Sequence, residues 1–205
     1  MVVTGNGIEQ ALGDRVFRSM FEERKRVFVD LLGWDIPTLA GRYEIDQFDD
    51  DEAVYIVITD DSGEHCGSAR LLRTDRPHIL DTIFPHLCED GPPAGPAVRE
   101  ITRFCLARRL RARDRLVTRN RLISALVRHA LHHGITAYTG VAEWAWFQQI
   151  LAFGWVCVPL GLPSISDPHS LSAMRIDISP ETPRLLRQSG TFEPIHLMDL
   201  DRAAA

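Results

Sequence analysis

The stretch Val98-Arg99-Glu100-Ile101-Thr102-Arg103-Phe104-Cys105-Leu106 decides how the rest of the chain is organised. Its apolar positions are typical of a buried strand, yet it also carries one carboxylate and two guanidinium groups. Burying such charges without partners would cost several kcal/mol. We therefore expect the charges of this strand to meet charged partners or a charged ligand.

The candidate partners lie upstream in three clusters. Arg24 falls on the apolar stripe of a predicted helix, where an arginine either reaches solvent at the helix edge or enters a site. Asp46 and Asp49 follow in an acidic segment. Arg70 lies among small residues on a predicted strand, so it is either held by a carboxylate of Asp49 or Glu100 or exposed on an edge strand. Together these clusters predict one pocket of mixed charge.

The predicted strand presents one geometric difficulty. Strict alternation places Glu100 on one face and Arg103 on the other, so a regular strand cannot direct both charges into one pocket. A β-bulge between the two residues would resolve this, and we expect one here.

The order of these side chains resembles that of the acyl-homoserine lactone synthases, the LuxI-type autoinducer synthases. The resemblance rests on nine residues at matching intervals: Arg24, Phe28, Trp34, Asp46, Asp49, Arg70, Phe84, Glu100 and Arg103. It covers about residues 17–161, while residues 162–205 form a divergent C-terminal part. We expect residues 1–205 to form a single synthase domain.

The resemblance implies a three-layer α/β sandwich with a central mixed, partly parallel sheet, similar to the GCN5-related N-acyltransferases. It implies an acyltransferase that makes a quorum-sensing signal from S-adenosyl-L-methionine and an acyl thioester, carried by acyl carrier protein or CoA. N-acylation and lactonisation would release 5'-methylthioadenosine. S-adenosylmethionine is then a substrate, and neither a cofactor nor a metal is expected.

The resemblance also suggests roles for individual residues. The catalytic candidates are Glu100, as the base that deprotonates the methionine amine, with Arg70, Asp46 and Asp49. S-adenosylmethionine carries charges of both signs, and the residues expected to bind it are Arg24, Phe28, Trp34, Arg103 and Phe104. The charged residues could instead form a structural ion network, and both interpretations remain open.

The acyl chain is expected between the sheet and its helices. The candidate pocket residues are Phe84, Leu122, Leu126, Val141, Ala142, Trp144, Trp146 and Phe147. Relatives that take 3-oxo chains commonly carry a threonine at a position that aligns with Ala142, although Thr139 is close. If the alignment with Ala142 is right, no hydroxyl holds a 3-oxo group, which favours an unsubstituted or otherwise different chain.

Composition sets the remaining bounds. The 205 residues are 45% hydrophobic with a net charge of −5, and we find neither an apolar run long enough to span a membrane nor a leader. These features predict a cytoplasmic protein. The four cysteines form no CxxC pair, which favours buried thiols over disulfides or zinc ligands.

Charge is unevenly distributed along the chain. The segment from Arg108 to Arg121 contains seven arginines and one acid, Asp114. This segment could dock an acyl carrier protein, hold a phosphate or contact nucleic acid, or it could be a solvated helix start. We expect neither nucleic acid nor membrane as a partner, and the sequence leaves the oligomeric state open.

Periodicity predicts the elements in chain order. We expect helices over residues 8–32, 120–133, 143–153 and 180–188, and a short helix packed by Phe84. Strands are expected over residues 53–59, 65–72, 98–106, 135–141, 155–160 and 172–178, the first two forming a hairpin. Strand-helix-strand units predict a partly parallel sheet.

Two other functions remain open. A general N-acyltransferase would acylate a different amine, which leaves Asp46 and Asp49 hard to explain. A non-catalytic regulator would bind a ligand or nucleic acid through the arginine segment. No nucleophile elbow, P-loop or dinucleotide-binding glycine motif is present in the sequence, which disfavours hydrolysis through a serine and Rossmann-type methyl transfer.

Overall fold

The computed structural model describes residues 1–164 and 170–195, and the backbone alone for residues 197–199. The contacts divide the chain into two compact units. Unit 1 comprises Met1–Leu71, Arg103–Ala125 and Glu193–Ala205, and unit 2 comprises Leu72–Thr102 and Leu126–Phe192. The single domain over 1–205 stays a prediction, and in the divergent part over 162–205 positions 165–169, 196 and 200–205 lie outside the described residues.

The strands of unit 1 follow the order β10-β1-β4-β5. The predicted hairpin is confirmed as β4 (Val54–Thr59) and β5 (His65–Arg73), which pair antiparallel. Two strands of this sheet were not predicted: β1 (Val2–Asn6) pairs antiparallel with β4, and β10 (Leu197–Asp199) pairs parallel with β1. Both are short and lack a periodic pattern, so only their partner strands reveal them.

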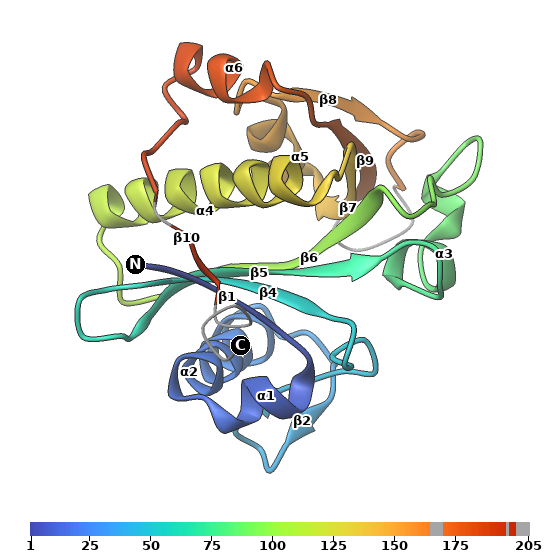
Figure 1. The fold of residues 1–205 in the computed structure, drawn as a ribbon. Coiled ribbons are helices and arrows are strands. Elements are labelled where there is room, and N and C mark those ends of the chain that lie inside the picture. The colour runs from blue at the N-terminus through green and yellow to red at the C-terminus, as the bar shows by residue number, and fades with distance from the viewer. Residues whose placement is uncertain (165–169, 196, 200–205) are drawn as a thin grey trace. The chain divides into compact units, whose positions relative to one another are not determined.

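The helices of unit 1 pack against β1 and β4 (Figure 1). The single helix predicted over 8–32 is instead three segments: α1 (Ile8–Gly13), α2 (Arg15–Arg24) and the π-helix η1 (Lys25–Leu31). Asp14 interrupts the helix because its side chain accepts a hydrogen bond from the Val16 amide and caps α2. Gly33, with φ of 69°, follows η1. A small hairpin of β2 (Thr38–Leu39) and β3 (Tyr43–Glu44) leads to the acidic segment.

Unit 2 contains three strands in the order β7-β9-β8 and the first part of β6. The parallel pairing of β6 (Val98–Leu106) with β7 (Ala137–Glu143) confirms the partly parallel sheet. Strand β9 (Leu171–Asp177) pairs antiparallel with β7 and with β8 (Val156–Pro159). The flanking helical segments are α3 (Ile79–Thr82), the 3₁₀ turn η2 (Pro85–Leu87), α5 (Trp144–Leu151) and α6 (Thr182–Gln188).

Helix α4 (Ala112–His133) is longer than predicted. Its first three turns contain four of the seven arginines of the segment, because arginine is a good helix former and the long side chains reach solvent. Gly134, with φ of 67°, ends it as predicted.

Strand β6 is irregular at Arg103. Glu100 and Thr102 are buried in alternation, and Cys105 and Leu106 are then buried in succession. Arg103 has φ of 51°, a left-handed conformation that is rare for a residue with a side chain. This break in alternation agrees with the irregularity that the two charges of the strand require.

Candidate active site

Unit 1 contains a buried cluster of six charged side chains. Arg24 comes from the end of α2, Glu44 from β3, Asp46 and Asp49 from the loop that follows, Arg70 from β5 and Arg103 from β6. The structure thus brings together five predicted residues from separate parts of the sequence: Arg24, Asp46, Asp49, Arg70 and Arg103. Three guanidinium groups face three carboxylates, so the cluster is balanced in charge.

Arg24 is one of the two most enclosed cations of the cluster, at 1% exposure. Its Nη1 and Nη2 atoms donate to the two Asp49 oxygens at 2.9 and 2.8 Å, and its Nε donates to Glu44 at 2.5 Å. The interpretation of Arg24 as a helix-edge residue that reaches solvent is therefore wrong. Its guanidinium is saturated by two buried carboxylates.

Arg70 forms the second fork of the cluster. It donates to both oxygens of Asp46 at 2.6 and 3.0 Å, and its Nη1 lies 2.8 Å from an Asp49 oxygen. Its side chain is fully buried, so the interpretation as an exposed edge arginine is wrong as well. Asp49 also accepts hydrogen bonds from the Tyr55 hydroxyl and the Asp46 amide. Asp49 therefore holds the acidic loop against the sheet.

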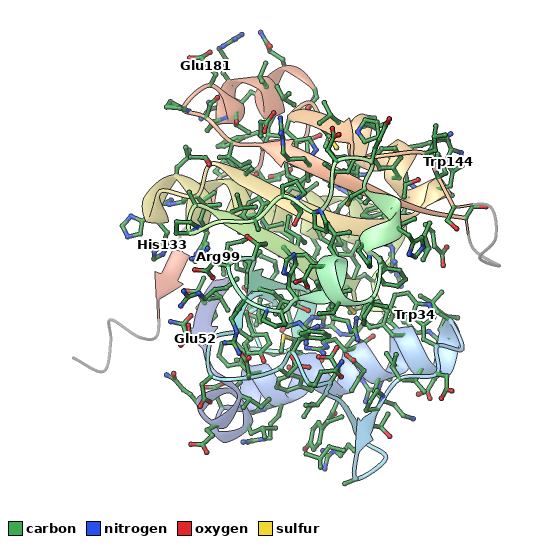
Figure 2. All side chains as sticks on the ribbon, turned by 90° about the vertical axis from the view of Figure 1, so that its right-hand side faces the viewer. Trp34, Glu52, Arg99, His133, Trp144 and Glu181 are labelled. Atoms are coloured by element: carbon green, nitrogen blue, oxygen red, sulfur yellow. The ribbon has the colours of Figure 1, made fainter. Side chains whose placement is uncertain are left out.

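Arg103 connects the cluster to an aromatic pair. Its Nε donates to Glu44 at 3.0 Å and its Nη2 to Asp46 at 2.6 Å. Its guanidinium carbon lies 5.7 and 5.8 Å from the ring centres of Phe28 and Trp34, which stack at 4.8 Å. Trp34 lies beside the end of η1 (Figure 2).

The exposed edge of the cluster is formed by two of its members. The Asp46 and Arg103 side chains retain 6% and 10% exposure, whereas those of Arg24, Glu44, Asp49 and Arg70 retain 1% or less. A charged ligand therefore meets the Asp46–Arg103 pair and the aromatic rings first. The four deeper residues are placed to hold that pair in position.

The pKa shifts follow from burial and from the opposite charges. Burial alone would raise the pKa of Asp46, but the hydrogen bond and charge of Arg70 outweigh it, and the pKa is lowered. The pKa of Asp49 is also lowered, since Arg24 and Arg70 outweigh its burial. Burial lowers the pKa of Arg103, and Glu44 only partly offsets this effect. Asp46 and Asp49 thus stay ionised at neutral pH.

Among the described residues, Glu44, Asp46 and Asp49 place oxygen atoms within 4.8 Å of one another, close enough to share a metal ion. Each of these carboxylates is already paired with at least one guanidinium group. A metal ion at this position would meet three adjacent positive charges. The donor set therefore does not fit a metal ion.

Glu100, the candidate base, belongs to unit 2. It is 0% exposed, and its Oε2 accepts a hydrogen bond from the Leu80 amide at the start of α3. Its register partner on β7 is Thr139, also fully buried. Glu100 thus lies beside an apolar cluster that contains Leu80.

The predicted acyl-pocket residues fall on different surfaces. Phe84 and Val141 pack against the apolar cluster of Leu80, Leu87 and Ala173. Ala142 points to the opposite face of β7 from Val141, because side chains alternate along a strand. Val141 and Ala142 therefore cannot line one pocket from the same side of the sheet.

The remaining predicted acyl-pocket residues differ in burial. Phe147, Leu122 and Leu126 are buried, and Trp146 packs edge-on against Phe153. Trp144 is 40% exposed and lies at the surface of its unit (Figure 2). Of the predicted nucleotide-binding residues, Phe104 is half-buried on β6 next to Arg103.

One member of the cluster, Glu44, and one hydrogen-bond partner of the cluster, Tyr55, were not predicted. Glu44 is 0% exposed and joins Arg24 to Arg103, and the Tyr55 hydroxyl donates to Asp49. Glu44 opens the acidic segment, two residues before Asp46, which was its only signal in the sequence. Tyr55 on a buried strand gave no signal, because tyrosine is common in strands.

Residues 10–184 match the model of the autoinducer synthase family. The chain belongs to this family. The match extends on both sides of the resemblance over 17–161. Within the described residues, no helix is both long and apolar enough to cross a membrane.

Several synthases of this family are similar to the chain. An acyl-homoserine-lactone synthase of Ralstonia solanacearum is 47% identical over 83 residues, 40% of this chain and 41% of that protein. The chain thus matches less than half the length of that relative. An isovaleryl-homoserine lactone synthase of Bradyrhizobium diazoefficiens is 27% identical over 89% of this chain and 82% of that protein.

Solved structures support the same fold. BjaI, described as a CoA-dependent acyl-homoserine lactone synthase with MTA, has a TM-score of 0.84 at 27% identity, covering 97% of this chain and 92% of that chain. TofI, in a complex with an inhibitor and MTA, has a TM-score of 0.76 at 29% identity, covering 95% and 98%. A Lactobacillus plantarum protein named for N-acetyltransferase activity shares the fold alone. It is 16% identical with a TM-score of 0.57, over 87% of this chain and 98% of that chain. The predicted α/β fold with a mixed sheet and flanking helices is confirmed.

Proposed function

We propose that this chain is an acyl-homoserine lactone synthase. It joins S-adenosyl-L-methionine to an acyl thioester and releases 5'-methylthioadenosine. The observation that carries the proposal is the Asp46–Arg103 pair, the partly exposed edge of a charge-balanced cluster, next to the stacked rings of Phe28 and Trp34. S-adenosylmethionine offers a carboxylate for a guanidinium, an ammonium and a sulfonium for carboxylates and aromatic faces, and an adenine for stacking. The structures of BjaI and TofI with MTA support this ligand class.

The deeper residues position the ligand-binding pair. Arg24, Asp49 and Arg70 are held by charge-assisted hydrogen bonds in a dry environment, where such bonds are strong. They fix Asp46, and Glu44 fixes Arg103. The aromatic pair shields the sulfonium from water, as cation–π contacts do when they are desolvated.

The reaction has two steps. The methionine amine loses a proton to the carboxylate of Glu100 and attacks the thioester carbonyl, so that an amide forms and the thiolate leaves. The methionine carboxylate then attacks its own γ-carbon, and the carbon–sulfur bond breaks. The sulfur takes the bonding electron pair and leaves as part of neutral methylthioadenosine. The new bond between the carboxylate oxygen and the γ-carbon closes the lactone ring.

We further propose CoA as the acyl carrier. Two similar solved structures, BjaI and MesI, are described as CoA-dependent synthases. The arginine segment offers exposed guanidinium groups at Arg111, Arg113 and Arg121, which suit the phosphates of CoA. The acidic surface of an acyl carrier protein would suit these guanidinium groups too. The identity of the acyl donor is therefore measured separately. A cytoplasmic location, where both substrates are made, belongs to the same proposal.

The test is a direct assay of the full chain. The purified protein is mixed with S-adenosylmethionine and acyl-CoA thioesters, methylthioadenosine is measured by chromatography, and the lactone is identified by mass spectrometry. We expect equal amounts of both products, in a reaction that requires both substrates. An acylated amine without methylthioadenosine would indicate a general N-acyltransferase and refute the proposal.

A further inference from the structure

Gly140 on β7 is buried, yet little surrounds the position of its missing side chain. Among the described residues, a Cβ atom built there would meet one atom within 4 Å, the carbonyl oxygen of Ile101 at 3.2 Å, which is a tight contact on one side only. At the buried glycines Gly5 and Gly67, a Cβ would collide with side chains at 2.5 and 2.8 Å. Unfilled space next to a buried backbone is uncommon, because protein interiors are close-packed. The space over Gly140 is therefore a candidate site for a ligand.

The register of the strands shows which side of the sheet this space is on. Gly140 shares its face of β7 with Tyr138 and Ala142. The Tyr138 hydroxyl donates to the Leu126 carbonyl of α4 at 2.9 Å, so this face is the one covered by α4. The opposite face carries Val141 and the packed cluster around Leu80. The position over Gly140 therefore faces α4 and not the Leu80 cluster.

Ser172 adds a polar group to this apolar face. It is the register partner of Ala142, and antiparallel partners point to the same side, so its hydroxyl also faces α4. Ser172 is 1% exposed, and its Oγ has no hydrogen-bond partner among the residues that the structure describes. A buried hydroxyl without a partner costs stability, and such groups are rare in folded proteins.

The neighbours of Ser172 on β7 are small. Ala142 directly opposite is small, and the diagonal neighbour is Gly140, since Gly140 pairs with Met174. Diagonal neighbours in an antiparallel pair lie about 7–8 Å apart, which is within reach of a chain carrying an oxygen atom. Gly140 and Ala142, two of the three smallest residues of β7, thus lie next to the unsatisfied hydroxyl.

We infer that Ser172 is a specificity residue whose hydroxyl donates a hydrogen bond to an oxygen atom on the acyl chain, lodged over Gly140 and Ala142. The favoured acyl class is then a chain with an oxo or hydroxy substituent. This inference rests on the proposed synthase function. It reverses the preference for unsubstituted chains that Ala142 suggested, because the hydroxyl comes from the neighbouring strand.

The test compares three CoA thioesters of equal length: hexanoyl, 3-oxohexanoyl and 3-hydroxyhexanoyl. We expect the full chain to have a kcat/KM for at least one oxygen-bearing donor about tenfold above that for hexanoyl, the size of one hydrogen bond. Ser172→Ala should bring this ratio close to one. The control Thr59→Val removes another buried hydroxyl without a described partner, in unit 1, and should keep the ratio. Equal use of all donors by the wild type, or a ratio that Ser172→Ala leaves intact, would overturn the inference.

A second variant tests the space itself. Ala142→Leu fills the volume next to Gly140 and should reduce kcat/KM for octanoyl-CoA more than for butanoyl-CoA, while an equal reduction would place the chain elsewhere. Calorimetry on the wild type and Ser172→Ala measures the dissociation constants of the three six-carbon thioesters. These constants give the preference for an oxygen-bearing donor over hexanoyl without turnover. If no donor releases methylthioadenosine, the synthase proposal fails, and the binding ratio alone decides the role of Ser172.

Discussion

Arg24 and Asp49 form a two-pronged ion pair, with nitrogen–oxygen distances of 2.9 and 2.8 Å, in which both side chains are buried. Removing one partner leaves the other charge buried and uncompensated. Arg24→Met should therefore lower the free energy of unfolding by about 3–5 kcal/mol. Urea titration monitored by circular dichroism measures this loss. Arg26→Met, two residues on and 59% exposed, is the matched control and should change stability by less than about 0.5 kcal/mol. Equal losses in the two variants would show that the buried cluster does not stabilise unit 1.

Arg103 should affect binding more than stability, because it lies at the exposed edge of the cluster. Arg103→Gln should lower kcat/KM for S-adenosylmethionine by about 10- to 100-fold, the cost of one or two charge-assisted hydrogen bonds. Steady-state kinetics at saturating acyl thioester provides the measurement. Arg109→Gln, an exposed arginine paired with Asp60, serves as the control. An Arg103 variant with unchanged kinetics would remove this residue from the nucleotide site.

Glu100→Gln should reduce kcat by about 10²–10⁴-fold, because glutamine cannot take the proton of the attacking amine. The glutamine side chain keeps an oxygen that can accept the hydrogen bond from the Leu80 backbone N–H. The circular dichroism spectrum should therefore show an intact fold. Activity should recover partly at high pH, where the amine loses its proton to solvent. Glu52→Gln changes an exposed acid in the same way and should retain full activity (Figure 2). A Glu100 variant with wild-type turnover would exclude the residue as the base.

Reversing the charges of the arginine segment should distinguish its roles. The triple variant Arg111→Glu, Arg113→Glu and Arg121→Glu changes exposed positions on or next to α4. If the segment holds CoA phosphates, KM for acyl-CoA rises at least tenfold and the wild-type KM rises with salt. KM for S-adenosylmethionine should stay constant. Unchanged kinetics with acyl-CoA, together with lost activity toward an acyl carrier protein, would reassign the segment to carrier-protein docking.

His65 should make stability depend on pH. Burial lowers its pKa to about 3, while an unfolded histidine titrates near about 6.5. Between these values the unfolded chain binds a proton that the folded chain does not, so stability is lost as pH falls. The loss from about pH 6.5 to pH 5 should be about 2 kcal/mol, measured by urea unfolding. His65→Gln should show a flatter profile over this window, and an equal slope would contradict the assignment to His65.

Asp46 and Asp49 act in a different pH window. The pKa values of Asp46 and Asp49 are lowered in the folded state. Their contribution to the free energy of unfolding is therefore fully present above the pKa of an unfolded aspartate, about 4, and is lost only as the pH falls below it. The two windows are therefore separable in one titration.

The sequence predicted the β4–β5 hairpin, the α4 stop at Gly134 and a partly parallel sheet, because periodicity and glycine positions act locally. It did not predict the break at Asp14 or the π-helix after Arg24. An apolar stripe is compatible with a continuous α-helix, and the π-helix shows only in backbone hydrogen bonds such as that from the Leu32 amide to the Val27 carbonyl, five residues back. Strands β1 and β10 were missed for a related reason, since each is short and is defined by its pairing with a neighbouring strand.

By itself, the sequence determined which residue types the candidate site contains and in what order they occur: three arginines, two aspartates, a glutamate and an aromatic pair. The tertiary structure decided which charges neutralise which, that Glu44 completes the cluster and that Asp46 and Arg103 form its exposed edge. It also placed Gly140, Ala142 and Ser172 on one face. The physical reason is that Coulomb attraction and burial depend on distances between segments far apart in the chain, which no local pattern records.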